Sequence, residues 1–476
     1  MNTNKKVITG GPMKSIWSKT VQLPKGKKLT RDMRVQNVVI GAGMAGILIA
    51  YLLQEKGQEV ILLEADEIAS GQTKNTTAKI TSQHGYIYYE MINNCGLERA
   101  KGYAEANEAA IQLYKEIITK EGIACQFEEL PSFLYSTEEQ GIEKLQKEAD
   151  AAQSLGINAV FLDGEEITEL PFQVTGAVRF AHQAQFHPLA FIQELVKKLT
   201  IYEHAKVLEV DDYMVLTEHN VIVADHIIFA THYPFPIVPG FYFLRQHQSR
   251  SYAVALHGEG VPKRLKGMYF SIDQDGLSFR CADEKLIVGG SSHRTGKYGV
   301  KRITEHGIVK TGYSHLEQKA INCYKEAIIT EKWAAQDCMP HDKIPFIGKF
   351  STKREHWYVA TGFQKWGMTS AMVAAMIISD EIIGIKNPYG EVFSPQRLLI
   401  KAGMKDFLVD VGESAMGLLK GVFKKTERKC GHMGCALVWN EDEHTWDCPC
   451  HGSRYAENGE VIDNPAQMDI CKNRQI

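Results

Sequence analysis

Four residues near the end of the chain have the types and the spacing of metal ligands. Cys430 and His432 form a Cys-x-His pair, and Cys448 and His451 form a Cys-x-x-His pair. Zinc binds two cysteines and two histidines in a tetrahedral site. The same side chains also suit a two-iron cluster, in which two cysteines hold one iron and two histidines hold the other. The pattern therefore predicts a metal centre, of zinc or of iron and sulfur.

A second group of residues, near the start of the chain, has the spacing of a dinucleotide-binding turn. Residues 35–64 read as a buried strand, a turn with glycines at 41, 43 and 46, an apolar helix and a second strand that ends at Glu64. Gly41 permits the tight turn, Gly43 lets the backbone approach a pyrophosphate, and Gly46 lets the helix pack on the strand. Glu64 is placed to accept hydrogen bonds from a ribose 2′-hydroxyl, which favours FAD or NAD over NADP. No second glycine fingerprint follows, which favours one tightly held flavin.

The elements around these residues predict a nucleotide-binding domain that is interrupted by another sheet. Residues 97–154 show helical spacing on either side of a strand at 132–136. Residues 250–292 alternate as strands of an antiparallel sheet inserted into the nucleotide domain. The chain then returns through a strand at 357–360 to a glycine-punctuated turn and a helix at 370–383. Such a turn at a helix N-terminus suits an electron-rich, partly anionic ring.

Composition excludes several classes of protein. The chain has 476 residues, which is enough for two or three domains with sizeable cores. The 54 lysines and arginines nearly balance the 57 acidic residues, so the sequence gives no reason to expect a nucleic-acid partner. It contains no apolar run of about 18 residues that could span a membrane, and no secretory signal follows the first residues. We therefore expect a cytoplasmic protein.

Residues 34 to 386 resemble the D-amino-acid-oxidase superfamily of FAD-dependent oxidoreductases, in the branch that contains glycine and sarcosine oxidases. The matching pieces are the glycine fingerprint, the stretch 70–79, Lys206-Val207 before 227–231, and the turn 360–369. The resemblance implies an α/β Rossmann-type FAD-binding domain with an interleaved antiparallel-sheet substrate domain (α+β). It also implies an FAD site made by Gly41, Gly43, Ala45, Gly46, Glu64, Ser70, Gly71, Thr77, Val207, Thr231, Gly362, Gly367, Met368 and Thr369.

The residues on the reacting side are less clearly marked. Arg280 lies on an expected strand where glycine-oxidase-like members place an arginine that binds the substrate carboxylate bidentately. A surface arginine on a strand edge is an equal alternative. Tyr252, Lys365 and Trp366 are further candidates for the catalytic pocket, together with His293. In flavin-dependent amine oxidation the cofactor supplies the chemistry and the protein mainly orients it, so no nucleophilic triad is needed.

The C-terminal cysteines and histidines resemble a Rieske [2Fe-2S] domain, because Cys448-Pro-Cys450-His451-Gly-Ser453 is a specific signature of that family. The resemblance favours the cluster over zinc, with Cys430, His432, Cys448 and His451 as ligands. It implies a disulfide between Cys435 and Cys450, as in Rieske proteins of cytochrome bc complexes. It also implies that Ser453 and Tyr455 donate hydrogen bonds to cluster sulfurs, which raises the reduction potential. The usual Gly-Pro-Ala is replaced by Asn464-Pro-Ala466, and few strands precede Cys430, so we expect a reduced, small all-β domain.

The resulting domain prediction has four parts. They are an N-terminal lead-in at 1–33, an FAD-dependent oxidoreductase domain at 34–386, a helical linker at 387–428 and a Rieske domain at 429–476. Within the second part, we assign about 34–90, 174–233 and 335–386 to the FAD and about 91–173 and 234–334 to the substrate. The linker has an amphipathic stretch with a basic end, which would also suit contact with a membrane surface.

These features predict a flavin dehydrogenase that acts on CH–NH donors. A small amine or amino acid would give two electrons to FAD, and one [2Fe-2S] cluster would pass them singly to an external acceptor, a protein or a quinone. A non-catalytic electron-transfer or redox-sensing protein is the alternative. A Rieske oxygenase also needs a mononuclear iron held by two histidines and a carboxylate. His182 and His187 have suitable spacing, but Arg179 stands where the acid should be, which argues against that class.

Overall fold

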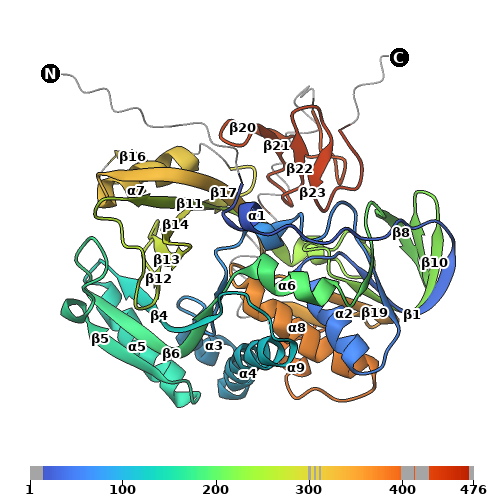
Figure 1. The fold of residues 1–476 in the computed structure, drawn as a ribbon, viewed down its shortest axis with the longest axis horizontal. Coiled ribbons are helices and arrows are strands. Elements are labelled where there is room, and N and C mark those ends of the chain that lie inside the picture. The colour runs from blue at the N-terminus through green and yellow to red at the C-terminus, as the bar shows by residue number, and fades with distance from the viewer. Residues whose placement is uncertain are drawn as a thin grey trace.

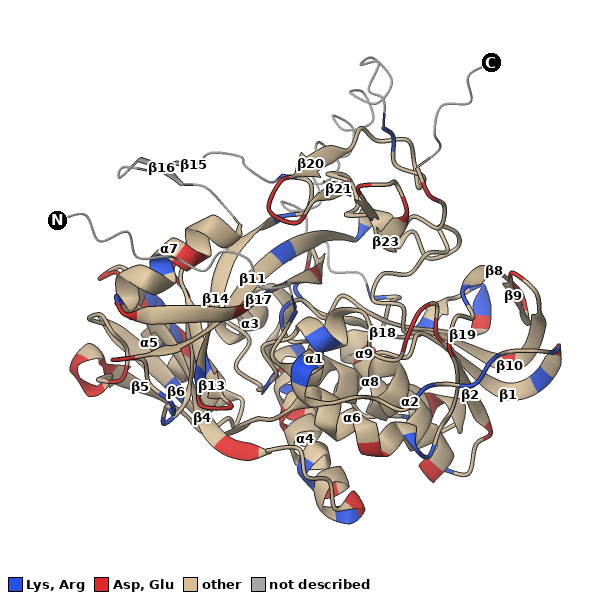
Figure 2. Cartoon of the chain, turned by 45° about the horizontal axis from the view of Figure 1, so that its top comes forward, with Lys and Arg blue, Asp and Glu red and all other residues tan. Residues whose placement is uncertain are grey.

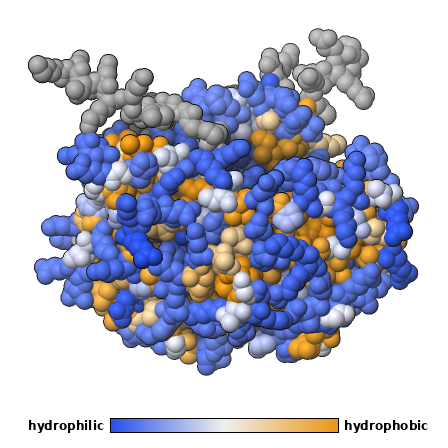
Figure 3. Space-filling view, in the orientation of Figure 1, coloured by the Kyte–Doolittle hydropathy of each residue, from blue (hydrophilic) through white to orange (hydrophobic). Residues whose placement is uncertain are grey.

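The computed structural model describes residues 14–297, 302–304, 307–309, 312–397, 412 and 428–470. Figure 1 shows two large sheets side by side, with a small sheet of the C-terminal residues lying on top where the two meet. Figure 2 shows basic and acidic residues interspersed over the visible side, without an extended area of one sign. Figure 3 shows a mostly hydrophilic face in which hydrophobic residues are scattered.

The first sheet has eight strands, and its central part is parallel. The order β7-β2-β1-β10-β19 places β1 in the middle, and β18 pairs with β19 antiparallel. Val39 packs on the helical side of β1, while Val38 and Ile40 point to the other face, because side chains alternate along a strand. The strands are β1 (Met33–Ile40), β2 (Val60–Leu63), β7 (Thr200–Tyr202), β8 (Val207–Asp211), β9 (Met214–Thr217), β10 (Val221–Phe229), β18 (Phe346–Ser351) and β19 (Arg354–Thr361).

The second sheet has nine strands in the order β17-β11-β14-β13-β12-β4-β6-β3, with β5 beside β6. Its pairs are antiparallel except for β4 and β12, which run parallel. The strands are β3 (Lys79–Ile80), β4 (Glu128–Ser136), β5 (Ala159–Asp163), β6 (Gly176–Gln185), β11 (Gln246–Gly258), β12 (Met268–Ser271), β13 (Ser278–Ala282), β14 (Lys285–Arg294) and β17 (Ala327–Pro340). A separate pair is formed by β15 (Arg302–Thr304) and β16 (Gly307–Val309).

Helices bury the apolar faces of both sheets. α2 follows the glycine turn and packs against α8, which in turn contacts α4, so that three helices share one core with the first sheet. α5 covers β5 and β6, and α7 covers β11 and β14. The helices are α1 (Trp17–Thr20), α2 (Met44–Glu55), α3 (Tyr88–Cys95), α4 (Leu97–Glu121), α5 (Gly141–Ser154), α6 (Pro188–Val196), α7 (Tyr313–Cys323), α8 (Gly367–Ile382) and α9 (Gly390–Phe393), with 3-10 turns at Gln72–Asn75, Gly164–Glu166 and Tyr242–Leu244.

The C-terminal residues form a four-stranded antiparallel sheet with its own small core. Its strands are β20 (Val438–Asn440), β21 (Thr445–Asp447), β22 (Arg454–Ala456) and β23 (Val461–Asp463). The predicted fold class is therefore confirmed: a Rossmann-type sheet, an interleaved second sheet and a small all-β domain. Among the described residues, no helix is long and apolar enough to cross a bilayer.

The structure differs from the sequence prediction at the edges of the domains. Trp17, in the expected lead-in, is fully buried, and its indole N–H donates to the carbonyl oxygen of Thr76. β6 falls in a range that we assigned to the FAD part, yet it pairs in the second sheet. The amphipathic stretch of the linker lies outside the described residues, apart from residue 412 and the segment before 398.

Candidate functional site

One cavity of about 890 Å³ begins at the carboxyl ends of the parallel strands of the first sheet and extends to the second sheet. β1 ends at Ile40, β2 at Leu63 and β10 at Phe229. Gly41, Glu64 and Thr231, which come just after these strands, line one end of the cavity. Ligands of open α/β sheets bind at this edge, because the chain turns away from each strand there and leaves a crevice. The other end is lined by Trp366 and Gly367, at the start of α8.

The glycine turn leaves no room for side chains. Gly41 has a φ of +105°, and a Cβ there would lie 2.6 Å from the carbonyl oxygen of Ala230. A Cβ on Gly46 would lie 1.9 Å from the carbonyl oxygen of Gly41, so this glycine allows the helix to pack on the turn. Glu64 accepts hydrogen bonds from the backbone N–H groups of Ala42 and Asp66 while it lines the cavity. The predicted cradle for a dinucleotide fits this geometry.

Most of the predicted FAD residues meet in this cavity. Those that line it are Gly41, Gly43, Ala45, Glu64, Ser70, Gly71, Thr77, Val207, Thr231, Gly367 and Met368. Gly46, Gly362 and Thr369 do not line it. Gly362, with a φ of +74°, lies so close to Pro340 that a Cβ would be 2.5 Å from the proline ring. The hydroxyl of Thr369 accepts from the N–H of Thr81 and donates to its carbonyl oxygen, which joins α8 to the segment after β3.

Three of the four predicted catalytic residues, Tyr252, Lys365 and Trp366, also line the cavity. The ammonium group of Lys365 donates to the hydroxyl of Ser292 at 2.5 Å. Tyr252 is buried, and its hydroxyl lies 2.9 Å from Nε2 of the predicted pocket residue His293. Trp366 stacks on His84, with ring centroids 4.9 Å apart. This end of the cavity therefore combines an aromatic wall with groups that can hold or accept a proton.

The structure does not bring Arg280 to the cavity wall. Its guanidinium is buried, donates to the carbonyl oxygens of Thr77 and Ala78, and lies 5.3 Å from the ring centre of Trp17. Alternation along a strand indicated that Arg280 would point to one face, but it could not indicate that the main chain of a distant loop lies there. Arg280 supports the loop that lines the cavity and is not positioned to bind a substrate carboxylate.

Lys79 and Asp337 are among the charged residues of the cavity wall that sequence reasoning did not single out. Lys79 is buried, and burial lowers its pKa to about 7. Asp337, on β17, accepts a hydrogen bond from the hydroxyl of Ser251 at 2.7 Å, and burial raises its pKa against the opposing effect of Lys365. Lys79 ends the stretch 70–79 that resembles the FAD-dependent family, whereas Asp337 belongs to no short motif. Only the pairing of β11 with β17 places Asp337 opposite Ser249 and near Ser251.

The predicted metal ligands lie on two loops of the C-terminal domain. Cys430 and His432 come from the first loop, and Cys448 and His451 come from the second, which follows β21. The two imidazole rings meet edge to face, with centroids 5.0 Å apart. The pKa of the Cys430 thiol is lowered to about 6, mainly by a hydrogen bond from Cys448. The hydroxyl of Tyr455 lies 3.3 Å from the sulfur of Cys430. The two thiols therefore lie beside each other, as do the two imidazoles, and a Rieske cluster needs these two pairs for its two irons.

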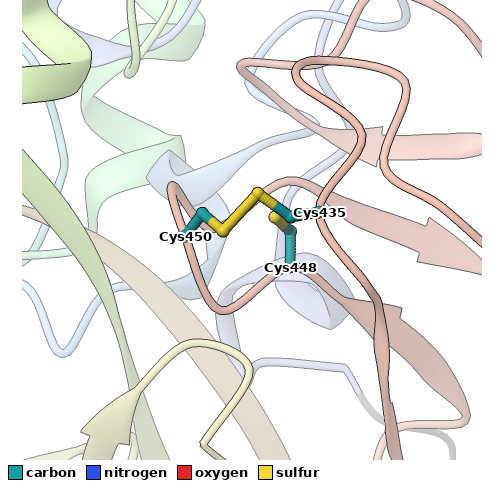
Figure 4. A group of neighbouring side chains, drawn as sticks. All are labelled: Cys435, Cys448 and Cys450. Atoms are coloured by element: carbon teal, nitrogen blue, oxygen red, sulfur yellow. A yellow bond between two sulfur atoms is a disulfide. The ribbon is translucent and has the colours of Figure 1, made fainter. Parts of the chain in front are cut away.

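Three sulfur atoms, those of Cys435, Cys448 and Cys450, also lie within 4.8 Å of one another (Figure 4). Cys435 and Cys450 are joined in a disulfide, as the resemblance implied, so they cannot act as thiolate ligands. The Nδ1 atom of His432 is buried and has no hydrogen-bond partner among the described residues, as expected for a nitrogen that binds a metal. The donor set fits a [2Fe-2S] cluster held by two thiolates and two imidazoles.

The second cluster loop is held on the second sheet by buried side chains. The amide of Gln248, on β11, donates to the carbonyl oxygen of His451 at 2.8 Å. The amide of Gln336, on β17, donates to Gln248 at 2.6 Å and to the carbonyl oxygen of Gly452 at 2.7 Å. The backbone N–H of Gln336 donates to the side chain of Gln72, in the loop that lines the cavity. A hydrogen-bonded series therefore runs from the cluster loop to the cavity.

The C-terminal domain also contributes directly to the cavity wall, through residues that include Glu443, Arg454 and Asn464. Arg250, on β11, binds both carboxylate oxygens of Glu443, with Nε at 3.0 Å from one of them and a terminal nitrogen at the other. Burial alone would raise the pKa of Glu443, but Arg250 and Arg454 lower it to about 2. The cavity is therefore completed by a residue that is ionised across the physiological range.

The histidines that an oxygenase would need for its mononuclear iron do not converge. His182 is on the surface, where Nδ1 lies 2.8 Å from Glu129. His187 is buried at the start of α6, where its ring lies 4.9 Å from that of Trp17. This arrangement removes the structural basis for the oxygenase alternative.

Comparison with known proteins identifies both the nucleotide-binding part of the chain and its C-terminal domain. The family model described as FAD dependent oxidoreductase matches residues 37–381, and the model described as Rieske [2Fe-2S] domain matches residues 399–472. The chain is 34% identical to the Rieske 2Fe-2S iron-sulfur protein YhfW of Bacillus subtilis (strain 168) over 94% of this chain and 95% of that protein.

Two partial matches correspond to the two functional parts. A 41-residue segment is 57% identical to the cytochrome b6-f complex iron-sulfur subunit of Synechococcus sp. (strain JA-3-3Ab), which covers 9% of this chain and 24% of that subunit. The fold is similar to that of glycine oxidase from Geobacillus kaustophilus, with a TM-score of 0.62 and 16% identity over 77% of this chain and 99% of that one. At this identity the second match shows the fold alone.

Proposed function

Because the chain belongs to the FAD-dependent oxidoreductase family and carries a C-terminal Rieske [2Fe-2S] domain, we propose that it oxidises a small amine or amino acid and passes the electrons through the cluster to an external acceptor. When bound, FAD would supply two-electron redox chemistry and the [2Fe-2S] cluster would supply one-electron transfer. The remaining steps depend on the side chains of the cavity and on the position of the cluster loop.

The observation that carries the proposal is the hydrogen-bonded series from the cavity to the cluster loop. Gln248 and Gln336 are each about 1% exposed, so their bonds to His451 and Gly452 hold the second loop against the wall of the flavin cavity. Each of these hydrogen bonds replaces a bond to water and contributes a net of about 0.5–1.5 kcal/mol to the docked arrangement. A simple oxidase would have no use for a cluster held beside its cavity.

The cavity also has the groups that an amine substrate needs. An ammonium substrate must lose a proton before its nitrogen lone pair can take part in oxidation. Asp337, on β17, lines the cavity and is placed to attract the cation, and we assign Lys365, which lines the same cavity, as the group that accepts the proton. Trp366 forms an aromatic wall at the start of α8. These features support an amine donor over an alcohol, which carries no cation to attract.

The test is anaerobic mixing of the holoprotein with a panel of small amines and amino acids in a stopped-flow spectrometer. We expect at least one compound to bleach the flavin first and to reduce the cluster in a second, slower phase. Reduced protein should show the low average g value of a histidine-ligated cluster. A cluster that stays oxidised after full flavin reduction would contradict the electron-transfer role and favour a structural or sensing cluster. A panel that leaves the flavin oxidised, while photoreduction of the flavin still reduces the cluster, would favour the non-catalytic electron-transfer protein.

A further inference from the structure

The cavity contains an arginine in the geometry that proteins use to bind carboxylates. Arg250 is about 2% exposed and points two N–H groups of one guanidinium edge at the two oxygens of one carboxylate. This fork-to-fork arrangement gives both strength and orientation. The hydroxyl of Tyr252, two residues further along β11, lies 3.3 Å from one of the same oxygens. Arg250 and Tyr252 together make a carboxylate receptor in the wall of the cavity.

The carboxylate in this receptor belongs to the chain itself. Glu443 lies in the turn between β20 and β21, in the C-terminal domain, and its side chain is 7% exposed. Its two oxygens also accept hydrogen bonds from Arg454 at 2.7 Å and from Asn440 at 3.3 Å. Every oxygen of the carboxylate therefore has at least two donors. A substrate carboxylate could bind Arg250 only by displacing Glu443 from this set.

The surrounding charges oppose a second carboxylate. Arg454 is itself bound by Glu443, Asp447 and Asp463. This buried network therefore contains two guanidinium groups and three carboxylates, and its carboxylates outnumber its cations. His293, beside Tyr252, has its pKa lowered by burial, and it therefore adds no cation at neutral pH. An added anion would meet net negative charge in a region that water screens poorly.

We propose that Glu443 is a specificity-determining residue: it occupies the carboxylate receptor formed by Arg250 and Tyr252, so that the docked protein accepts amines that present no carboxylate at this position. The inference rests on the proposed amine oxidation. It narrows the proposed substrate class from amines and amino acids to amines without a carboxylate at this position. The C-terminal domain thus has a part in substrate selection that is separate from its part in electron transfer.

The test measures binding of acetate and benzoate to the oxidised holoprotein, by perturbation of the flavin spectrum and by calorimetry. We expect weak binding to the wild type and binding that is about tenfold tighter or more to Glu443→Gln, because the variant leaves Arg250 with a neutral, weaker partner. The double variant Glu443→Gln with Arg250→Met should lose this gain. Asp442→Asn is the matched control. It removes a charge from the same turn, where Asp442 accepts from the N–H of Tyr313, and it should bind acetate as the wild type does.

Two results would overturn the proposal. One is that Glu443→Gln binds acetate no more tightly than the wild type while its flavin and cluster spectra are unchanged. The other is that Arg250→Met weakens acetate binding in the wild-type background, because the receptor would then be open to ligands despite Glu443. The measurement involves no turnover, so it is independent of the search for a substrate. If no amine reduced the flavin but the variant gained acetate binding, the proposed function would fail and the role of Glu443 as occupant of the receptor would stand.

Discussion

At the scale of single residues, Arg280 shows how a position can be predicted while its role is not. The sequence placed it on a strand, and the structure has it on β13. Its guanidinium instead binds the carbonyl oxygens that precede Lys79, and Trp17 covers it. Arg280 therefore fixes the loop that turns from the FAD stretch into β3.

We expect Arg280→Met to lower the free energy of unfolding by about 1–3 kcal/mol, because it leaves buried carbonyl oxygens without donors. The concentration dependence of flavin reduction by substrate should stay near that of the wild type. Chemical denaturation and stopped-flow reduction would measure the two effects. Arg280→Lys keeps one donor and should recover part of the stability. A variant with full stability and a much weakened substrate response would instead assign Arg280 to substrate binding.

The residues that sequence reasoning found belong to local patterns, whereas those it missed depend on contacts between distant segments. The glycine turn, Glu64 and the Cys-His pairs are each encoded within about thirty residues, and short motifs carry their own geometry. Arg250 and Glu443 are 193 residues apart in the chain and share no motif. Their pairing depends on how the C-terminal domain docks, and the pattern of apolar and polar residues in the sequence does not predict that docking.

At the scale of elements, β11 carries both functional contacts of the C-terminal domain. This strand presents Gln248 to the cluster loop and Arg250 to Glu443, and it pairs with β14 and β17 over most of its 13 residues. The sequence predicted strands from residue 250 onward. It did not predict that this strand extends back to Gln246, because the polar residues before Arg250 are typical of a solvent-exposed segment.

We expect Gln248→Leu and Gln336→Leu to slow reduction of the cluster after photoreduction of the flavin by about tenfold each. Each change leaves a buried partner unsatisfied, at a cost of roughly 1–3 kcal/mol to the docked state, and 1.4 kcal/mol corresponds to a factor of ten. The spectrum of the cluster should not change, since no ligand is altered. Gln246→Leu is the control, because this residue is equally buried on β11 but donates to Thr361. Equal slowing in all three variants would show a general loss of packing.

At the scale of the whole molecule, docking of the C-terminal domain depends on pH through Glu443. Its carboxyl pKa is lowered from 4.5 to about 2 in the folded protein, because the attraction of Arg250 and Arg454 outweighs the effect of burial. A lowered pKa contributes stability that is fully present above the unfolded value and is lost as the pH falls through the folded value. The contribution of Glu443 should therefore be complete above about pH 4.5 and should disappear towards pH 2.

We expect the wild type to unfold at a higher temperature than Glu443→Gln at pH 7, and the two transitions to approach each other as the pH falls below 4.5. Calorimetric scans of both proteins over that range would measure the difference. Asp442→Asn serves again as the control for loss of charge in the turn, and its offset from the wild type should be small at every pH. A constant offset between wild type and Glu443→Gln would mean that the carboxylate charge does not hold the domains together.

The shared cavity has a consequence for how the protein is made. The residues that line the flavin end of the cavity lie between Ile40 and Ala371, whereas Glu443, Asp463 and Gln467 cover it from the C-terminal domain. During synthesis the cradle leaves the ribosome before its cover, so the cofactor can load into an open cleft and become enclosed when the last domain folds. The ammonium group of Lys206, beside the nucleotide end, donates to the carbonyl oxygen of Gln467. The rate at which bound flavin exchanges would then be limited by the rate at which the C-terminal domain undocks. Retention of the cofactor would depend on that rate as well as on the affinity of the cavity.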